Sequence, residues 1–273
     1  MTEIVQYLPL LALLLAIGAL AGVVAGLLGV GGGIVLVPAF FYTFTVLGYG
    51  GDHVMQICLA TSLATIVVTS IRSVMSHNKK GAVDWDILKK WAPGVVIGAV
   101  LGVLTAAQLK STVLQGIFGF FGILIGLYMA FGKSEWRLGE SMPGGALRAF
   151  WSTFIGYMSV LMGVGGGSFA VPTLSLFGRP IHRAVATAAG FGLLIALPSA
   201  IAFLLVPIPA EVRPPLTIGA INLPAFGIII AMTLLTAPLG AELAHSMNPK
   251  PLKRVFALFI TLVALNMLRQ TFF

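Results

Sequence analysis

GVGGGIVLVP at residues 29–38 decides the fold, because the chain repeats it as GVGGGSFAVP at residues 163–172. Seven of the ten positions match at an offset of 134 residues. A single glycine cluster would carry little weight, but two clusters at matching places predict an internal repeat.

Weaker matches extend this repeat beyond the glycine clusters in both copies. They occur at offsets of 126 and 138 residues, so the loops between matching segments differ in length. We therefore expect two related halves of about five segments each, with residues 1–131 as the first repeat, 132–148 as a cytoplasmic linker and 149–273 as the second repeat. The matched pairs are Ala60-Thr61 with Ala186-Thr187, and Leu101-Gly102, Leu114, Phe118 and Leu124 with Leu239-Gly240, Leu252, Phe256 and Leu262.

The composition indicates that the solvent for this chain is a lipid bilayer. Hydrophobic residues make up 58% of the 273 residues and charged residues only 9%, with a mean hydropathy of +1.04. A soluble domain carries roughly 25% charged residues. About 20 apolar residues span the hydrocarbon core as a helix, and several uncharged runs reach that length. We expect an all-α polytopic (multi-pass) membrane protein.

The net charge of +8 does not indicate nucleic-acid binding, because the basic residues lie in short loops between apolar runs. Cys58 is the single cysteine, which excludes an internal disulfide, and the four histidines have no ligand spacing. We therefore expect neither a metal nor a cofactor. The N-terminus has Glu3 and no basic region before its apolar run, so we expect a retained helix rather than a signal peptide.

The second glycine cluster interrupts an apolar run that is too short to cross the membrane twice. Its arms, 149–162 and 168–178, reach roughly 21 and 17 Å at about 1.5 Å per residue. Neither spans the ~30 Å hydrocarbon core. We expect the first pair of segments in each half to be a glycine-broken, partly re-entrant helical hairpin. The arms of the first cluster, 4–28 and 34–51, are longer, which leaves open a first hairpin that spans the membrane fully.

Equivalent loops in the two halves carry opposite charge bias. Residues 76–90 contain four lysines, whereas their counterpart 207–216 contains only Arg213. Placing 76–90, the linker, 178–183 and 245–254 in the cytoplasm puts twelve basic residues inside and three outside. The positive-inside rule and the odd number of segments per half predict inverted repeats, with both termini on the external side.

Each glycine cluster has the properties of an anion site. Irregular backbone at membrane depth needs protein or water around it. We expect helices to begin at Ile34 and Ser168, and their first N–H groups lack partners at the positive end of the helix dipole. Such a terminus contributes up to ~2 kcal/mol to anion binding when partly buried. Broken helices at a repeat interface also indicate a transporter's substrate site. The alternative is a tight turn that packs closely and binds nothing.

Hydroxyl groups beside the clusters are candidates for further hydrogen bonds to an anion. The alternative is that they bond their own helix backbone, or that Ser168 is a helix cap. The predicted substrate-binding residues are Gly31, Gly32, Gly33, Ile34, Thr61, Ser62, Thr65, Gly165, Gly166, Gly167, Ser168 and Thr187.

Two charged residues at the ends of apolar runs are candidates for other roles. Arg72 either snorkels to the interface or attracts anions in a vestibule. Glu242 either reaches the interface or takes part in coupling to protons, since acids at membrane depth are often functional.

With these residues, the chain resembles the sulfite exporter family (TauE/SafE, also called the sulfonate uptake permease family). The resemblance rests on GVGGGIVLVPAFFY, ATSL, HNKKGAVDW and the second GVGGG with FAVP, and it covers about residues 15–268. It implies a bacterial inner-membrane permease for sulfite, organosulfonates or related sulfur anions. Ala60 departs from the glycine common in the family, and the second copy, ATAAG at 186–190, lacks the serine, which puts a serine role there in doubt.

The leading hypothesis is a secondary transporter, an exporter working by alternating access around a mid-membrane anion site. Its partners would be a small sulfur oxyanion or sulfonate, the lipid bilayer and a coupling ion, either a proton or sodium. A homodimer is left open. The alternatives are a passive anion channel, a metal-cation permease and, in a different class, an intramembrane enzyme.

Overall fold

The computed structural model describes residues 12, 14–23, 32–132, 136–246 and 249–271, with the side chains of 240–246, 249–253 and 255 outside this description. Almost all of the ordered elements are helices, as the composition predicts. They are a helix at Leu14–Val23, α2 (Gly33–Val46), α3 (Val54–Lys79), α4 (Trp85–Ala106), α5 (Ser111–Phe131), α6 (Gly145–Leu161), α7 (Gly167–Leu176), α8 (Ile181–Leu204), α9 (Leu223–Ser246) and α10 (Pro249–Arg269).

Four of these helices, α3, α4, α5 and α8, are long and apolar enough to cross a membrane. The helices beside the glycine clusters are shorter: α2 has 14 residues, α6 has 17 and α7 has 10. At about 1.5 Å per residue, α7 extends only about 15 Å, roughly half of the hydrocarbon core.

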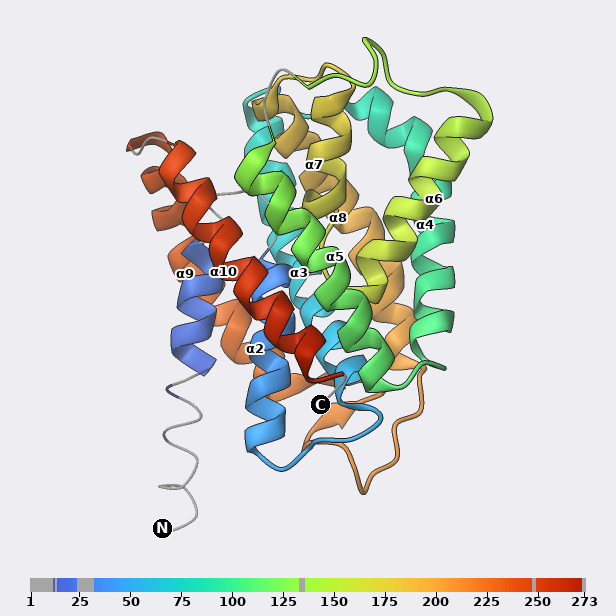
Figure 1. Ribbon diagram of the computed structural model, residues 1–273, viewed down its shortest axis with the longest axis vertical. Helices are drawn as coiled ribbons and strands as arrows, with labels where there is room; N and C mark the ends of the chain where they lie inside the picture. The colour runs from blue at the N-terminus through green and yellow to red at the C-terminus, as the bar shows by residue number, and fades with distance from the viewer. Residues whose placement is uncertain (1–11, 13, 24–31, 133–135, 247–248, 272–273) are drawn as a thin grey trace.

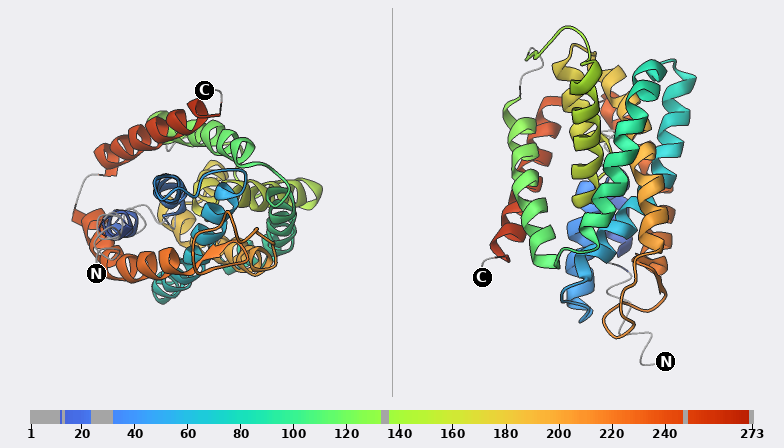
Figure 2. Two further views of the ribbon diagram at one scale, coloured as in Figure 1. Left: turned by 90° about the horizontal axis from the view of Figure 1, so that it is seen from below. Right: turned by 90° about the vertical axis from the view of Figure 1, so that its right-hand side faces the viewer.

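Helices α3 and α8 form the centre of the molecule. They pack against each other, and each also packs against a short helix that begins at a glycine cluster, α2 on α3 and α7 on α8. Figures 1 and 2 show α4 with α6, and α5 with α10, outside this centre. The innermost side chains include Leu59, Leu63 and Ile66 of α3 and Ile195 of α8, which are fully buried.

Glycines allow the outer pairs of helices to approach closely. A Cβ added at Gly102 would lie 2.8 Å from the Val160 side chain and 3.0 Å from the Tyr157 carbonyl of α6. A Cβ added at Gly122 would lie 2.8 Å from Ala264 of α10. Gly94, Gly98 and Gly102 are four residues apart, as are Gly122 and Gly126, and this spacing predicts small-residue packing faces. The close contacts of these glycines with α6 and α10 confirm them.

The loops that carry most of the basic residues meet at one end of the bundle, which we call the basic end (Figure 1, top). It comprises the turn after α3, the described part of the linker before α6, the loop between α7 and α8, the end of α9 and the start of α10. The linker is fixed there, because Leu138 N–H donates to the Leu176 carbonyl over 2.7 Å. The turn before α3, the turn before α5, the loop before α9 and the end of α10 lie at the other end (Figure 1).

Two boundaries differ from those that the sequence predicts. Helices α2 and α7 begin at Gly33 and Gly167, one residue before the expected Ile34 and Ser168. The uncharged run 214–241 becomes helical only at Leu223, because Pro214, Pro215 and Gly219 come first. Two short antiparallel strands, β1 (Thr217–Ile218) and β2 (Ile221–Asn222), lie in this non-helical stretch before α9.

Candidate functional site

The two glycine clusters meet inside the molecule. A Cβ added at Gly33 would lie 2.8 Å from the Gly163 carbonyl oxygen and 3.0 Å from the Val164 Cα, so the backbones touch. Ser62 of α3 donates a hydrogen bond of 2.7 Å from its hydroxyl to the same Gly163 carbonyl. Gly31 lies outside the described residues. We call this contact between the clusters the tip contact.

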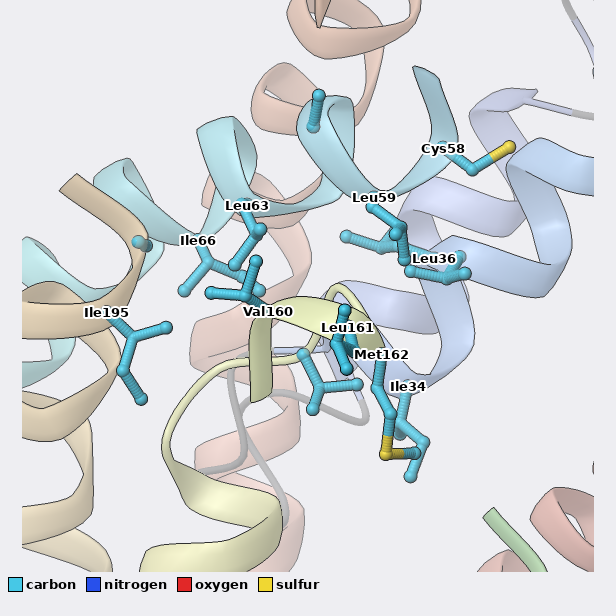
Figure 3. Close-up of a cluster of buried hydrophobic side chains, with 14 of the residues drawn as sticks. Ile34, Leu36, Cys58, Leu59, Leu63, Ile66, Val160, Leu161, Met162 and Ile195 are labelled. Carbon is cyan, nitrogen blue, oxygen red and sulfur yellow. The ribbon is translucent and has the colours of Figure 1, made fainter. Parts of the chain in front are cut away.

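Apolar side chains surround the tip contact (Figure 3). Ile34, which follows the first cluster, points beside Met162, which precedes the second, and both are buried. Leu59 and Ile66 of α3 cover it from one side. In this conformation the region around the tips is packed.

The first turn of α7 has N–H donors with no acceptor in the part of the chain that the structure describes. Its first internal bond runs from Ala170 N–H to the Gly166 carbonyl, 2.7 Å. The N–H groups of Gly167, Ser168 and Phe169 donate to no backbone or side-chain acceptor among the described residues. These are the donors that a helix N-terminus leaves free, at the positive end of its dipole. Gly165, just before this turn, is buried.

Ser168 adds a buried hydroxyl to this turn. It is 5% exposed, and its Oγ has no hydrogen-bond partner in the part of the chain that the structure describes. Such a group costs about 1–3 kcal/mol if nothing ever binds it. Ser168 lines a cavity of about 240 Å³ between α5, α6 and α7. The other lining residues are Phe121, Leu124, Ile125, Tyr128, Leu138, Trp151, Phe169, Pro172, Thr173, Leu176 and Phe177.

Thr61 and Thr187, which match in the repeat, make matching bonds to the other half of the chain. The Thr61 hydroxyl accepts from Asn222 N–H over 3.0 Å, just before α9. The Thr187 hydroxyl accepts from Asp84 N–H over 3.0 Å, just before α4. Asp84 and Asn222 are themselves related by the offset of 138 residues that links the later segments. Each half therefore holds a loop of the other through one threonine.

The same two loop residues also cap the helices that follow them. Asp84 Oδ1 accepts from Ile87 N–H over 3.2 Å at the start of α4. Asn222 Oδ1 accepts from Ala225 N–H over 3.0 Å at the start of α9. Aspartate and asparagine are both favoured helix caps, so the two junctions are built alike.

The remaining predicted residues are Thr65, Arg72 and Glu242. Thr65 donates from its hydroxyl to the Thr61 carbonyl, 2.9 Å, which is the bond to its own helix that the alternative anticipates. Arg72 is exposed and lines neither the cavity beside Ser168 nor the second cavity, which is described next. The Glu242 side chain lies outside the described residues.

A second cavity, of about 720 Å³, lies at the basic end and is polar. Four basic side chains line it, Lys90, Arg148, Arg179 and Arg183, against two acidic ones, Asp84 and Asp86. In the sequence, these basic residues indicate only the orientation of the chain in the membrane. Their grouping could not be read from the sequence, because they come from both halves and from the linker.

Comparisons with known proteins agree with these observations. The family model described as sulfite exporter TauE/SafE matches residues 14–267. A "Probable membrane transporter protein" of Haemophilus influenzae is 31% identical over 255 residues, covering 93% of this chain and 97% of that protein. Another from Methanocaldococcus jannaschii is 25% identical over 264 residues, covering 96% and 97%. No solved structure matches the chain.

Proposed function

Because the chain belongs to the sulfite exporter TauE/SafE family, whose curated relatives are named as probable membrane transporters, we propose that it is a secondary transporter of small sulfur-containing anions. The single observation that carries the anion site is the first turn of α7. There, the N–H groups of Gly167, Ser168 and Phe169 and the Ser168 hydroxyl have no hydrogen-bond partner among the described residues, and Ser168 and Phe169 line a cavity of about 240 Å³. Donors without acceptors at a positive helix end suit sulfite or a sulfonate group.

We propose inverted repeats as the basis of the mechanism. The matching bonds of Thr61 to Asn222 and of Thr187 to Asp84 support this arrangement, because each crosses from one half to the other. The loops that carry these partners lie at opposite ends of the bundle, the turn between α3 and α4 at the basic end and the loop before α9 at the other (Figure 1). The basic end would then face the cytoplasm by the positive-inside rule, with both termini outside.

In this scheme the packed tip contact is the closed point of the cycle. One half rocks against the other, the tips separate, and the first turns of α2 and α7 become open to an anion from one side at a time. A coupling ion, a proton or sodium, would drive the cycle. A passive channel would need a continuous path, whereas Ile34, Met162 and Leu59 fill the space at the tips.

Replacement of Ser168 by alanine tests the anion site. We expect Ser168→Ala to lower the initial rate of sulfite or thiosulfate flux into proteoliposomes by about tenfold, since one hydrogen bond to a charged group contributes about 1.5–3 kcal/mol. Ser159→Ala is the matched control, because Ser159 of α6 is also buried and unpartnered but does not line the cavity. Equal flux in wild type and Ser168→Ala would remove this residue from the site. No flux of any sulfur anion with wild-type protein would reject the proposed function.

A further inference from the structure

The two matching junctions differ in charge. Asp84 and Asn222 have the same two structural tasks: the N–H donates to a threonine, and one side-chain oxygen caps the next helix. Asn222 performs both without a charge, and its Nδ2 also donates to the Pro215 carbonyl and to the Thr217 hydroxyl, each over 3.0 Å. Neither shared task needs the negative charge of Asp84, whose side chain is only 16% exposed.

The oxygen of Asp84 that does not cap the helix faces an arginine. Asp84 Oδ2 lies 3.7 Å from Nη1 of Arg179, in the loop between α7 and α8. The pair joins the first half of the chain to the second at the basic end. Both residues line the polar cavity of about 720 Å³, as do Lys90, Arg148 and Arg183.

The charges of this cavity suit a doubly charged anion. Four basic side chains against two acidic ones leave a surplus of two positive charges among its described lining residues. Like charges gathered in a concave site raise the local concentration of ions of opposite sign. Arginine presents paired donors that match the oxygens of a tetrahedral oxyanion.

We propose that this cavity is a binding site for a small tetrahedral oxyanion with two negative charges, separate from the tip contact. Without a bound anion, Asp84 forms an ion pair with Arg179, and an incoming anion replaces Asp84 as the partner of Arg179. Because the ion pair connects the two halves, binding removes one of their connections at the basic end. The inference rests on the proposed function for the identity of the anion as a sulfur oxyanion. A lipid phosphate shares this chemistry, so the test must separate the two sources.

The test is the affinity of purified full-length protein in lipid-free detergent micelles for sulfite, thiosulfate and sulfate, measured by isothermal titration calorimetry, with chloride as a control. We expect Arg183→Gln to weaken dianion binding by about tenfold, the loss of one charge-assisted hydrogen bond. Asp84→Asn keeps the cap and should tighten binding by about two- to fivefold, the value of a partly exposed ion pair.

Two control variants separate the effect of the Asp84–Arg179 ion pair on affinity from the effect of the overall charge around the cavity. Asp86→Asn removes the same charge from the cavity wall, but no ion pair to Arg179 is recorded for Asp86 in the described part of the chain. Asp86→Asn should therefore change the affinity for the dianion by less than Asp84→Asn does. Asp52→Asn removes a charge at the other end of the bundle, where Asp52 pairs with Lys110 over 3.8 Å, and should leave affinity unchanged.

The outcomes separate this inference from the proposed function. Equal tightening by Asp84→Asn and Asp86→Asn would overturn the role of the ion pair, and unchanged affinity in Arg183→Gln would overturn the site. Binding seen only with vesicles of anionic lipid, and not with phosphatidylcholine vesicles or soluble dianions, would overturn it as well. Transport of sulfite with no binding at the cavity rejects the inference alone. Dianion binding that depends on Arg183, without transport, supports the inference and counts against the proposed function.

Discussion

The two glycine clusters have the same sequence, but their matching glycines are needed for different physical reasons. Gly32 has φ 75° and ψ −12°, a left-handed conformation that other residues rarely adopt. Its counterpart Gly166 has φ −55° and ψ −22°, which any residue adopts. At Gly166 the constraint is space, because an added Cβ would lie 2.8 Å from Gly192 N of α8. A repeated motif can thus preserve a residue while the constraint on it changes.

The largest loss in the free energy of unfolding is expected from a substitution of Gly163. At this glycine the left-handed backbone conformation and the lack of space for a side chain act together. Its φ is +61°, and an added Cβ would lie 2.7 Å from Val37 Cγ2 and 2.9 Å from Leu59 Cα. We expect Gly163→Ala to lower the free energy of unfolding by roughly 2–5 kcal/mol, the left-handed strain and the overpacking taken together. SDS titration of the purified protein in mild detergent measures this. A loss below about 1 kcal/mol would show that the tip relaxes easily, contrary to the packed contact described above.

A smaller effect, with a sharper signature, is expected from the matching pair itself. At Gly32, asparagine should be tolerated better than alanine, whose left-handed conformation costs about 1–2 kcal/mol. At Gly166 the order should reverse, because asparagine is larger and the overpacking penalty is about 1–3 kcal/mol for even small groups. The four variants are compared by their unfolding free energies in the same detergent. The same order at both positions would remove the distinction between conformation and space.

The smallest effect is expected at the threonines that tie the halves together. Thr61→Val and Thr187→Val each remove one acceptor for a backbone N–H, worth about 1 kcal/mol. We expect Thr61→Val to cost more, because its bond to Asn222 is buried whereas that of Thr187 to Asp84 is partly buried. Thr69→Val serves as a control, since the Thr69 hydroxyl bonds its own helix and no other element among the described residues. If the two junction variants unfold at the same detergent concentration as this control, the threonines do not tie the halves together.

Much of the fold could be predicted because its signals are local. The uncharged runs 53–71, 91–109, 111–132 and 184–210 overlap most of α3, α4, α5 and α8, and the glycines before α7 marked its start to within one residue. The loop over residues 214–222 was missed because apolar composition alone does not separate a helix from an irregular segment. Prolines 214 and 215 were the available signal, since a residue before proline avoids the helical region.

The candidate site could be predicted only in part. Ser168 was identified from its place after the glycines, but its lack of a partner depends on the side chains that surround it. Ser62 was predicted as an anion ligand, and in this conformation its hydroxyl bonds the Gly163 carbonyl, 101 residues away. The basic cavity was not predicted, because Lys90, Arg148 and Arg183 come together only when α4, α6 and α8 pack.

The sequence by itself determined that this chain is a helical membrane protein with a repeated, glycine-broken motif, because helix formation, membrane insertion and glycine's backbone freedom depend on residues close together in the chain. Only the tertiary structure decided that Thr61 meets Asn222, that Thr187 meets Asp84 and that Asp84 faces Arg179. Such contacts depend on how distant segments fold back on each other, and no local pattern specifies that geometry.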